Sequence, residues 1–246
     1  MRSRRGRGCI DDHYRTIVSE SAIPPPNGAC RRPALRRHGC RRWDNRRVPT
    51  RLTHTRPTAL AVWLLIAGVI GWVAAFALTV EKFHLLENPG SSASCDFSVI
   101  VQCGANLASA QGSVFGFPNP LLGLTGWVAP LVVGAAVLAG ARFARWFWLL
   151  FWAGIAFAFG FVVWLISQSI FVLGTLCPWC MVTWVVTIPT FYAVTLHLLR
   201  SGIVPVPQRL RDLAASLMGW LPVLAVVSYA VVALIAQLRL DWIGTL

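Results

Sequence analysis

Five apolar runs dominate the sequence, and each is about twenty residues or longer. At a rise of about 1.5 Å per residue, a helix of that length crosses the roughly 30 Å hydrocarbon core of a bilayer. We expect the spans at about 59–80, 120–140, 146–173, 178–199 and 216–237. Hydrophobic residues make up 56% of the chain and charged residues only 13%. The sequence therefore predicts an all-α integral membrane protein.

Most of the formal net charge of +13 lies in the first 57 residues. Fifteen arginines and four acidic residues give this segment +11, which leaves +2 for the rest of the chain. The segment is rich in Arg, Pro and Gly and has no apolar periodicity, so we expect residues 1–57 to be a disordered tail. Such a polybasic tail beside a span indicates a cytoplasmic location next to anionic lipid of the bilayer, and we expect no nucleic-acid partner.

The positions of the other arginines predict the topology. Arg142 and Arg145 separate the second and third runs, and three further arginines, Arg200, Arg209 and Arg211, follow the fourth. With the basic tail in the cytoplasm, five spans place both of these connections on the cytoplasmic side, as the positive-inside rule requires. The long connection 81–119 and the short turn before Cys177 then lie on the oxidising, extracytoplasmic side.

Two pairs of cysteines lie on that side. Cys177-Pro178-Trp179-Cys180 begins the fourth run, and Cys95 and Cys103 lie in the long connection. If Cys177 is the N-cap and Pro178 the first helical residue, Cys177 and Cys180 share a face and can form or open a disulfide without unfolding. The helix N-terminus also favours the reactive thiolate. The sequence leaves open a static disulfide, half of a zinc site, or thiols without a role; the seven residues between Cys95 and Cys103 are unlike zinc-binding spacing, so we expect no metal.

In this arrangement the chain resembles the bacterial vitamin K epoxide reductase (VKOR) family, quinone reductases that are functional counterparts of DsbB. The resemblance covers residues 58–200 well and the fifth span more loosely. It rests on the two cysteine pairs, on Ser109 six residues after Cys103, and on the run Val-Phe-Gly-Phe-Pro-Asn-Pro-Leu-Leu-Gly at 114–123. Together these motifs are specific, although no single one would be.

The resemblance implies a membrane domain over 58–240, with a four-helix bundle around a quinone, menaquinone or ubiquinone, and a fifth, peripheral helix. It assigns Cys180 to the quinone side and Cys177 as its resolving partner. Cys95 and Cys103 become the shuttle that meets external protein thiols. Near the quinone the resemblance places Ser109, Asn119, Phe115 and Trp184. Animal members tend to have tyrosine at the position of Trp184, which puts a hydroxyl contact there in doubt.

The implied activity is that of a membrane enzyme that reoxidises a secreted, DsbA-like thioredoxin-fold protein and passes its electrons to a membrane quinone. This would support disulfide bond formation at a bacterial cytoplasmic membrane. Many relatives carry a fused thioredoxin-like domain after the fifth span, whereas this chain stops at Leu246, so we expect a free donor. Two other classes stay open: a non-enzymatic, disulfide-stapled membrane scaffold, and a reductive transmembrane thiol conductor.

Overall fold

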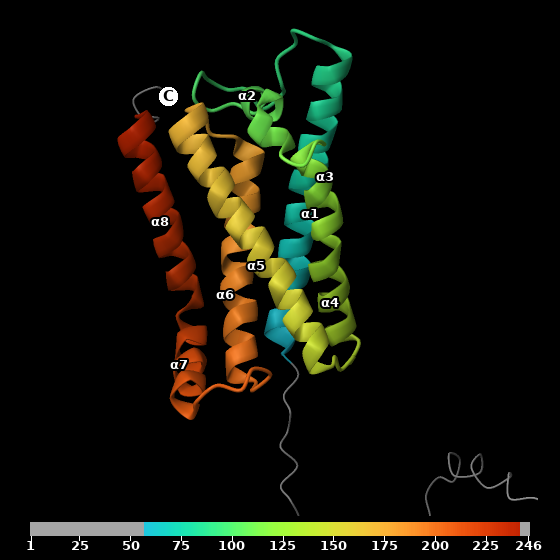
Figure 1. Cartoon of the computed structure of the whole chain (residues 1–246), viewed down its shortest axis with the longest axis vertical. Helices are drawn as coiled ribbons and strands as arrows, with labels where there is room; N and C mark the ends of the chain where they lie inside the picture. The colour runs from blue at the N-terminus through green and yellow to red at the C-terminus, as the bar shows by residue number, and fades with distance from the viewer. Residues whose placement is uncertain (1–56, 242–246) are drawn as a thin grey trace, which may run out of the picture. The chain divides into compact units, whose positions relative to one another are not determined.

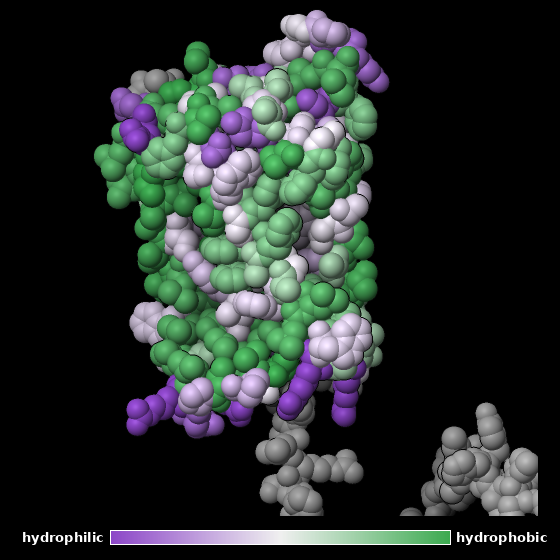
Figure 2. Space-filling view, in the orientation of Figure 1, coloured by the Kyte–Doolittle hydropathy of each residue, from purple (hydrophilic) through white to green (hydrophobic). Residues whose placement is uncertain are grey.

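The computed structural model describes residues 57–241, which form a bundle of helices (Figure 1). Within this range five helices are long and apolar enough to cross a membrane, which confirms the predicted all-α membrane protein. The expected cytoplasmic tail, residues 1–57, lies outside the described residues except for Pro57. Figure 2 shows hydrophobic side chains over the middle of the bundle and hydrophilic side chains gathered toward its two ends.

Helix α1, Thr58–Glu87, is the longest and continues well past the expected end of the first span at Val80. It ends where the chain meets Asn88-Pro89-Gly90, and Gly90 adopts a φ of +94°, a conformation that glycine accepts without strain. One side of α1 packs against α3 and α4, and another packs against α6. The extra turns beyond Val80 bring its end beside the segment that holds Cys95 and Cys103.

The second span consists of two helices, α3 (Asn119–Gly126) and α4 (Val128–Leu138). The break falls at Trp127 because Pro130 has no N–H to donate and its ring displaces the carbonyl of the preceding turn. This side of the bundle lies very close to α1. A Cβ atom on Gly71 would come within 2.1 Å of the Trp127 ring, so glycine is required there for the two helices to pack.

Helix α5, Arg145–Gln168, is extended by a π-helical turn, Ser169–Leu173, and stops at Gly174 in the left-handed region. Helix α6, Pro178–Arg200, runs back through the bundle and is its most buried span. At the end of the bundle where α1 begins and α6 ends, the four helices α1, α4, α5 and α6 share a hydrophobic core. The fully buried members of this core are Ala61, Leu64 and Val194, and its aromatic members include Trp148 and Phe151.

The end of the chain differs from the expected fifth span. A separate amphipathic helix, α7 (Gln208–Gly219), packs against α6, and the fifth span α8 (Leu221–Leu240) begins only after it. The sequence placed the start of this span at about residue 216. Gly219 ends α7, and Pro222 lies at the start of α8, where its missing N–H is tolerated.

The cysteine loop, which we define as residues 88–118, connects α1 to α3 and contains two short helices. These are α2, Gly104–Ala108, and a 3₁₀ turn, Ala110–Ser113. A parallel β-bridge pairs Val101 with Leu176, just before α6. The cysteine loop is thereby fixed to the N-terminal end of α6, at the end of the bundle opposite α7 (Figure 1).

Candidate functional site

All four predicted cysteines lie together where the cysteine loop meets the start of α6. Cys95 and Cys103 form a disulfide, whereas Cys177 and Cys180 are free thiols. The Sγ atom of Cys177 lies 3.5 Å from the Sγ atom of Cys103. Cys103 and Cys177 are completely buried, and Cys95 is only 4% exposed. The two pairs are therefore in sulfur-to-sulfur contact within a closed apolar cluster that includes Leu78 and Leu107.

The N-terminus of α6 holds Cys177 as the sequence predicts. Cys177 is the N-cap, Pro178 is the first helical residue, and the backbone N–H of Cys180 donates to the Cys177 sulfur at 3.3 Å. The hydrogen bond from the Cys180 side chain, together with backbone N–H groups, lowers the pKa of Cys177 below its ordinary value. Burial and the negative charge of Asp96 act in the opposite direction but are outweighed. Cys177 is thus the thiol prepared to react as a thiolate.

Asp96 organises the cysteine loop, a role that sequence reasoning missed. One carboxylate oxygen accepts hydrogen bonds from the backbone N–H groups of Cys103 at 2.7 Å and Gly104 at 2.9 Å, and the other accepts from Ala93 at 3.0 Å. Hydrogen bonds to a charged acceptor are stronger than neutral ones. The available signal was an acidic residue directly after Cys95, followed by Gly104 at the start of a short helix. Asp96 therefore holds the segment between the two cysteines in a defined turn.

Further hydrogen bonds attach the cysteine loop to its neighbours. Leu176 N–H donates to the carbonyl of Ile100 at 2.7 Å, and Gln102 N–H donates to the carbonyl of Leu176 at 3.0 Å. From α1, the Lys82 ammonium donates to the carbonyl of Leu107 at 2.7 Å. These bonds lie on both sides of Cys103, so they fix its sulfur against that of Cys177.

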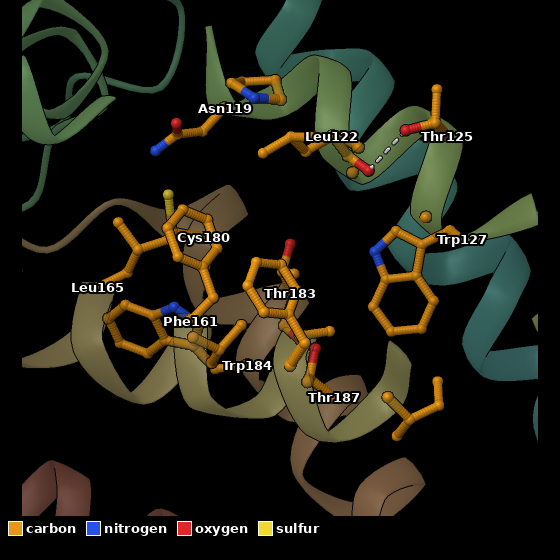
Figure 3. Close-up of a pocket in the computed structure, with 18 of the residues that line it drawn as sticks. Asn119, Leu122, Thr125, Trp127, Phe161, Leu165, Cys180, Thr183, Trp184 and Thr187 are labelled. Carbon is orange, nitrogen blue, oxygen red and sulfur yellow. Dashed lines mark hydrogen bonds between the residues drawn. The ribbon is translucent and has the colours of Figure 1, made fainter. Parts of the chain in front are cut away.

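A cavity of about 850 Å³ opens beside Cys180. It is bounded by α1, α3, α4, α5 and α6 and by the end of the cysteine loop. Figure 3 shows Cys180, Thr183 and Thr187 projecting from α6 on one side, with Leu122 and Trp127 on the other. Its volume is within the range of ligand pockets, and its lining is mainly aliphatic and aromatic. The cavity therefore suits an apolar ligand with a ring and a hydrocarbon tail, such as a quinone. Because Cys180 lines the cavity, a ligand bound there would lie near the Cys180 sulfur.

The four residues expected near the quinone differ in their positions. Trp184, Ser109 and Asn119 line the cavity, but Phe115 does not; its ring contacts Phe161, which does, with centroids 5.8 Å apart. The Ser109 hydroxyl donates to the carbonyl of Asn106 at 2.7 Å and caps the 3₁₀ turn. The Asn119 amide donates to the carbonyl of Gln111 at 2.7 Å, which uses one of its two N–H donors.

Two threonines on the cavity wall were not predicted. Thr183 and Thr187 follow Cys180 at helical spacing, and this spacing was the signal that would have found them. Each hydroxyl donates to a carbonyl one turn earlier, at 3.2 Å and 2.7 Å. Because a hydroxyl oxygen keeps acceptor capacity after donating, this wall offers hydrogen-bond acceptors to a ligand.

Comparison with known families supports the resemblance described above. A family model described as the vitamin K epoxide reductase family matches residues 62–195, more than half of the chain. The matched segment contains all four cysteines and the residues of the cavity wall on α3 to α6. Comparison with curated proteins gave no match.

Proposed function

Because the chain belongs to the vitamin K epoxide reductase family, we propose that it reoxidises a secreted, DsbA-like thioredoxin-fold protein and passes the electrons to a quinone in the cavity. The family alone makes it a membrane thiol–disulfide oxidoreductase that works with a quinone. The observation that carries the finer proposal is the 3.5 Å separation between the Cys103 and Cys177 sulfur atoms. At this contact the pair in the cysteine loop, which we expect to meet the donor, touches the pair on α6. The second cysteine of the α6 pair, Cys180, lines the cavity.

The proposed cycle begins at the cysteine loop. The donor's two thiols reduce the Cys95–Cys103 disulfide by exchange, so the donor leaves as a disulfide and the cysteine loop gains two electrons and two protons. Since both loop sulfurs are buried in the closed arrangement, the loop must first open toward the donor. When it closes again, Cys103 returns to contact with Cys177.

Electrons then pass from the cysteine loop to α6. The Cys103 thiolate attacks Cys177 of a Cys177–Cys180 disulfide, and the Cys180 thiolate leaves. The Cys95 thiolate next attacks Cys103 and displaces the Cys177 thiolate. The products are a Cys95–Cys103 disulfide and the Cys177, Cys180 dithiol, the same redox state that the described structure has. The lowered pKa of Cys177 favours it as the leaving thiolate in this second exchange.

When bound, the quinone accepts two electrons and two protons from the dithiol, which returns to a disulfide. The protein residues position it and exclude water. The second N–H of Asn119 is the donor that we assign to a ring oxygen, and Thr183 and Thr187 supply acceptors along α6. A well-aimed donor at a developing oxyanion is worth about 2.7–4 kcal/mol.

We further propose that the cysteine loop faces outside the cytoplasmic membrane of a bacterium and that the N-terminus is cytoplasmic. The cations support this orientation. Five arginines lie at the end opposite the cysteine loop, namely Arg142, Arg145, Arg200, Arg209 and Arg211. Toward the end of the bundle that carries the cysteine loop, the described residues contain Lys82 and Arg239. The Lys82 ammonium donates to a carbonyl of the loop, and the Arg239 Cζ atom lies 5.0 Å from the centroid of the Phe171 ring.

The test is quinone reduction by the purified full-length protein, with a reduced C-x-x-C thioredoxin-fold protein as donor and a short-chain quinone as acceptor. We expect multiple turnovers, and we expect Cys180→Ala and Cys95→Ser each to reduce the rate to background. Cys40→Ser is the matched control and should retain the parent rate. A parent protein that turns over with neither ubiquinone nor menaquinone analogues, while properly folded, would contradict the proposal and favour the scaffold.

A further inference from the structure

Helix α7 has an apolar face that the protein covers only in part. Ala214 is buried against the bundle, but Leu210 and Leu213 on the neighbouring part of the helix are 46% and 53% exposed. Trp220, directly after α7, is 60% exposed. Leucines at helical spacing beside an exposed tryptophan are typical of a helix that lies at the boundary between lipid and water. The position of α7 at one end of the bundle agrees with such a boundary (Figure 1).

The polar side of this region carries arginines without acidic partners. Arg200 and Arg209 are exposed, and Arg211 packs its guanidinium over Gly202, 3.3 Å from where a Cβ atom would lie. In the part of the chain that the structure describes, none of the three forms an ion pair with a carboxylate. The nearby Asp212 instead accepts a hydrogen bond from Gln208 at 2.9 Å.

Arg211 has a side-chain nitrogen atom that the surrounding residues leave without a partner. Its Nε atom is buried and has no hydrogen-bond partner among residues 57–241. A buried donor without a partner is costly, and an anion at the remaining nitrogen atoms of the guanidinium would offset part of that cost. The side chain is only partly buried, so its terminal nitrogens can be approached from outside. Arginine also suits phosphate because its planar fork donates two parallel hydrogen bonds.

We propose that α7, with Arg200, Arg209 and Arg211, binds the phosphate groups of anionic phospholipids in the leaflet opposite the cysteine loop. The exposed leucines favour a lipid over a free phosphate ion, because they place an apolar surface beside the arginines. The lipid tails then cover Leu210 and Leu213, while the headgroup compensates the Arg211 charge. This site is separate from the cavity beside Cys180 and does not depend on the proposed electron path.

The experiment measures lipid binding to the full-length protein in detergent by native mass spectrometry and by the melting temperature. The lipids are dioleoyl-phosphatidylglycerol and, as a neutral comparison, dioleoyl-phosphatidylcholine. We expect phosphatidylglycerol to be retained and to raise the melting temperature more than phosphatidylcholine does. Arg209→Gln and Arg211→Gln should each weaken phosphatidylglycerol binding about five-fold, as expected for the loss of one arginine–phosphate contact.

Arg142→Gln is the matched control, because Arg142 is also exposed at this end of the bundle but lies away from α7. It should leave phosphatidylglycerol binding unchanged. Equal binding of the two lipids, or equal losses in Arg142→Gln and Arg209→Gln, would overturn the proposal. Full competition by millimolar inorganic phosphate would also overturn it, since the site would then bind free phosphate. Arg209→Gln keeps the test valid if Arg211→Gln fails to fold, because Arg209 is exposed.

Discussion

The contact between the Cys103 and Cys177 sulfurs makes a specific prediction about a trapped intermediate. With Cys180→Ala, the disulfide between Cys177 and Cys180 cannot form, so Cys177 is left to pair with Cys103, its 3.5 Å neighbour. We expect a Cys103–Cys177 disulfide in most of the oxidised variant, identified by non-reducing peptide mapping. Met181→Ala, which keeps all four cysteines, should not accumulate this bond. Recovery of Cys95–Cys103 alone from oxidised Cys180→Ala would argue against exchange between the pairs.

The lowered pKa of Cys177 predicts a pH dependence. A thiol reacts as its thiolate, so a lower pKa moves the onset of thiolate formation at Cys177 to a lower pH than the value of about 8.5 for a free cysteine. Asp96→Asn removes a charge that raises the pKa of Cys177, so the midpoint should fall further. Cys180→Ala removes the largest lowering influence, so the midpoint should rise.

These midpoints are measured in the reduced protein by NMR, as the pH dependence of the ¹³Cβ chemical shift of Cys177, because no reagent then has to reach the buried sulfur. Glu87→Gln removes an exposed carboxylate that does not act on Cys177 and serves as the control for net charge. A midpoint that rises in Asp96→Asn would show that Asp96 acts on Cys177 through loop position rather than through charge.

The residue identities were easier to predict than their hydrogen bonds. The sequence singled out both cysteine pairs, because their spacing is visible in the chain and the arginines predict their side of the membrane. It pointed to Ser109 and Asn119 as contacts of the quinone ring. It could not reveal that the Ser109 hydroxyl and the Asn119 amide each donate a hydrogen bond to a carbonyl of the cysteine loop. Those partners depend on how the cysteine loop turns, which Asp96 controls through hydrogen bonds to residues on both sides of it. Their proposed contacts with the quinone stay predictions.

Among the helices, the closest packing is between α1 and the start of α4, and it rests on glycine. In Gly71→Ala the new methyl group would lie within 2.1 Å of the buried Trp127 ring, so either the ring or α1 must move. We expect a destabilisation of about 1–3 kcal/mol, the usual cost of overpacking a core. Thermal unfolding in detergent, followed by tryptophan fluorescence, would measure it.

Gly160→Ala on α5 is the matched control, because nothing lies within 4 Å of the Cβ position at Gly160. Alanine has a higher helix propensity than glycine, so this variant should be neutral or more stable by up to about 1 kcal/mol. If the two variants unfold at the same temperature, α1 and α4 do not pack as closely as described.

The five apolar helices could be predicted from hydropathy, but two of their ends could not. Hydropathy falls at Glu81, whereas α1 continues to Glu87, because Lys82 to Glu87 are compatible with a helix and the first strong breaker is Pro89. Helix α7 was treated as part of a connection because its arginines dominated the interpretation. Its apolar residues at 210, 213, 214 and 217 have helical spacing, which a search for amphipathic helices would have found.

The proposed orientation of the whole molecule in the membrane predicts which positions can be labelled from outside the cell. Phe97, at the tip of the cysteine loop, is 72% exposed, and Arg142 is exposed at the other end. In a background with Cys9, Cys30 and Cys40 replaced by serine, a membrane-impermeant maleimide should label Phe97→Cys in intact cells but not Arg142→Cys. Labelling of Arg142→Cys alone would reverse the proposed orientation.

The burial of Cys95, Cys103 and Cys177 limits which thiols can reach their sulfur atoms. In the closed arrangement a small thiol, such as a peptide cysteine or a secreted metabolite, finds no exposed sulfur in either pair from the water side. Only a partner that draws the cysteine loop outward gains access, and this opening requires the paired backbone bonds between Ile100, Gln102 and Leu176 to separate. In the proposed cycle, the packing that positions two sulfurs for exchange therefore also keeps quinone from being consumed by thiols that are not substrates.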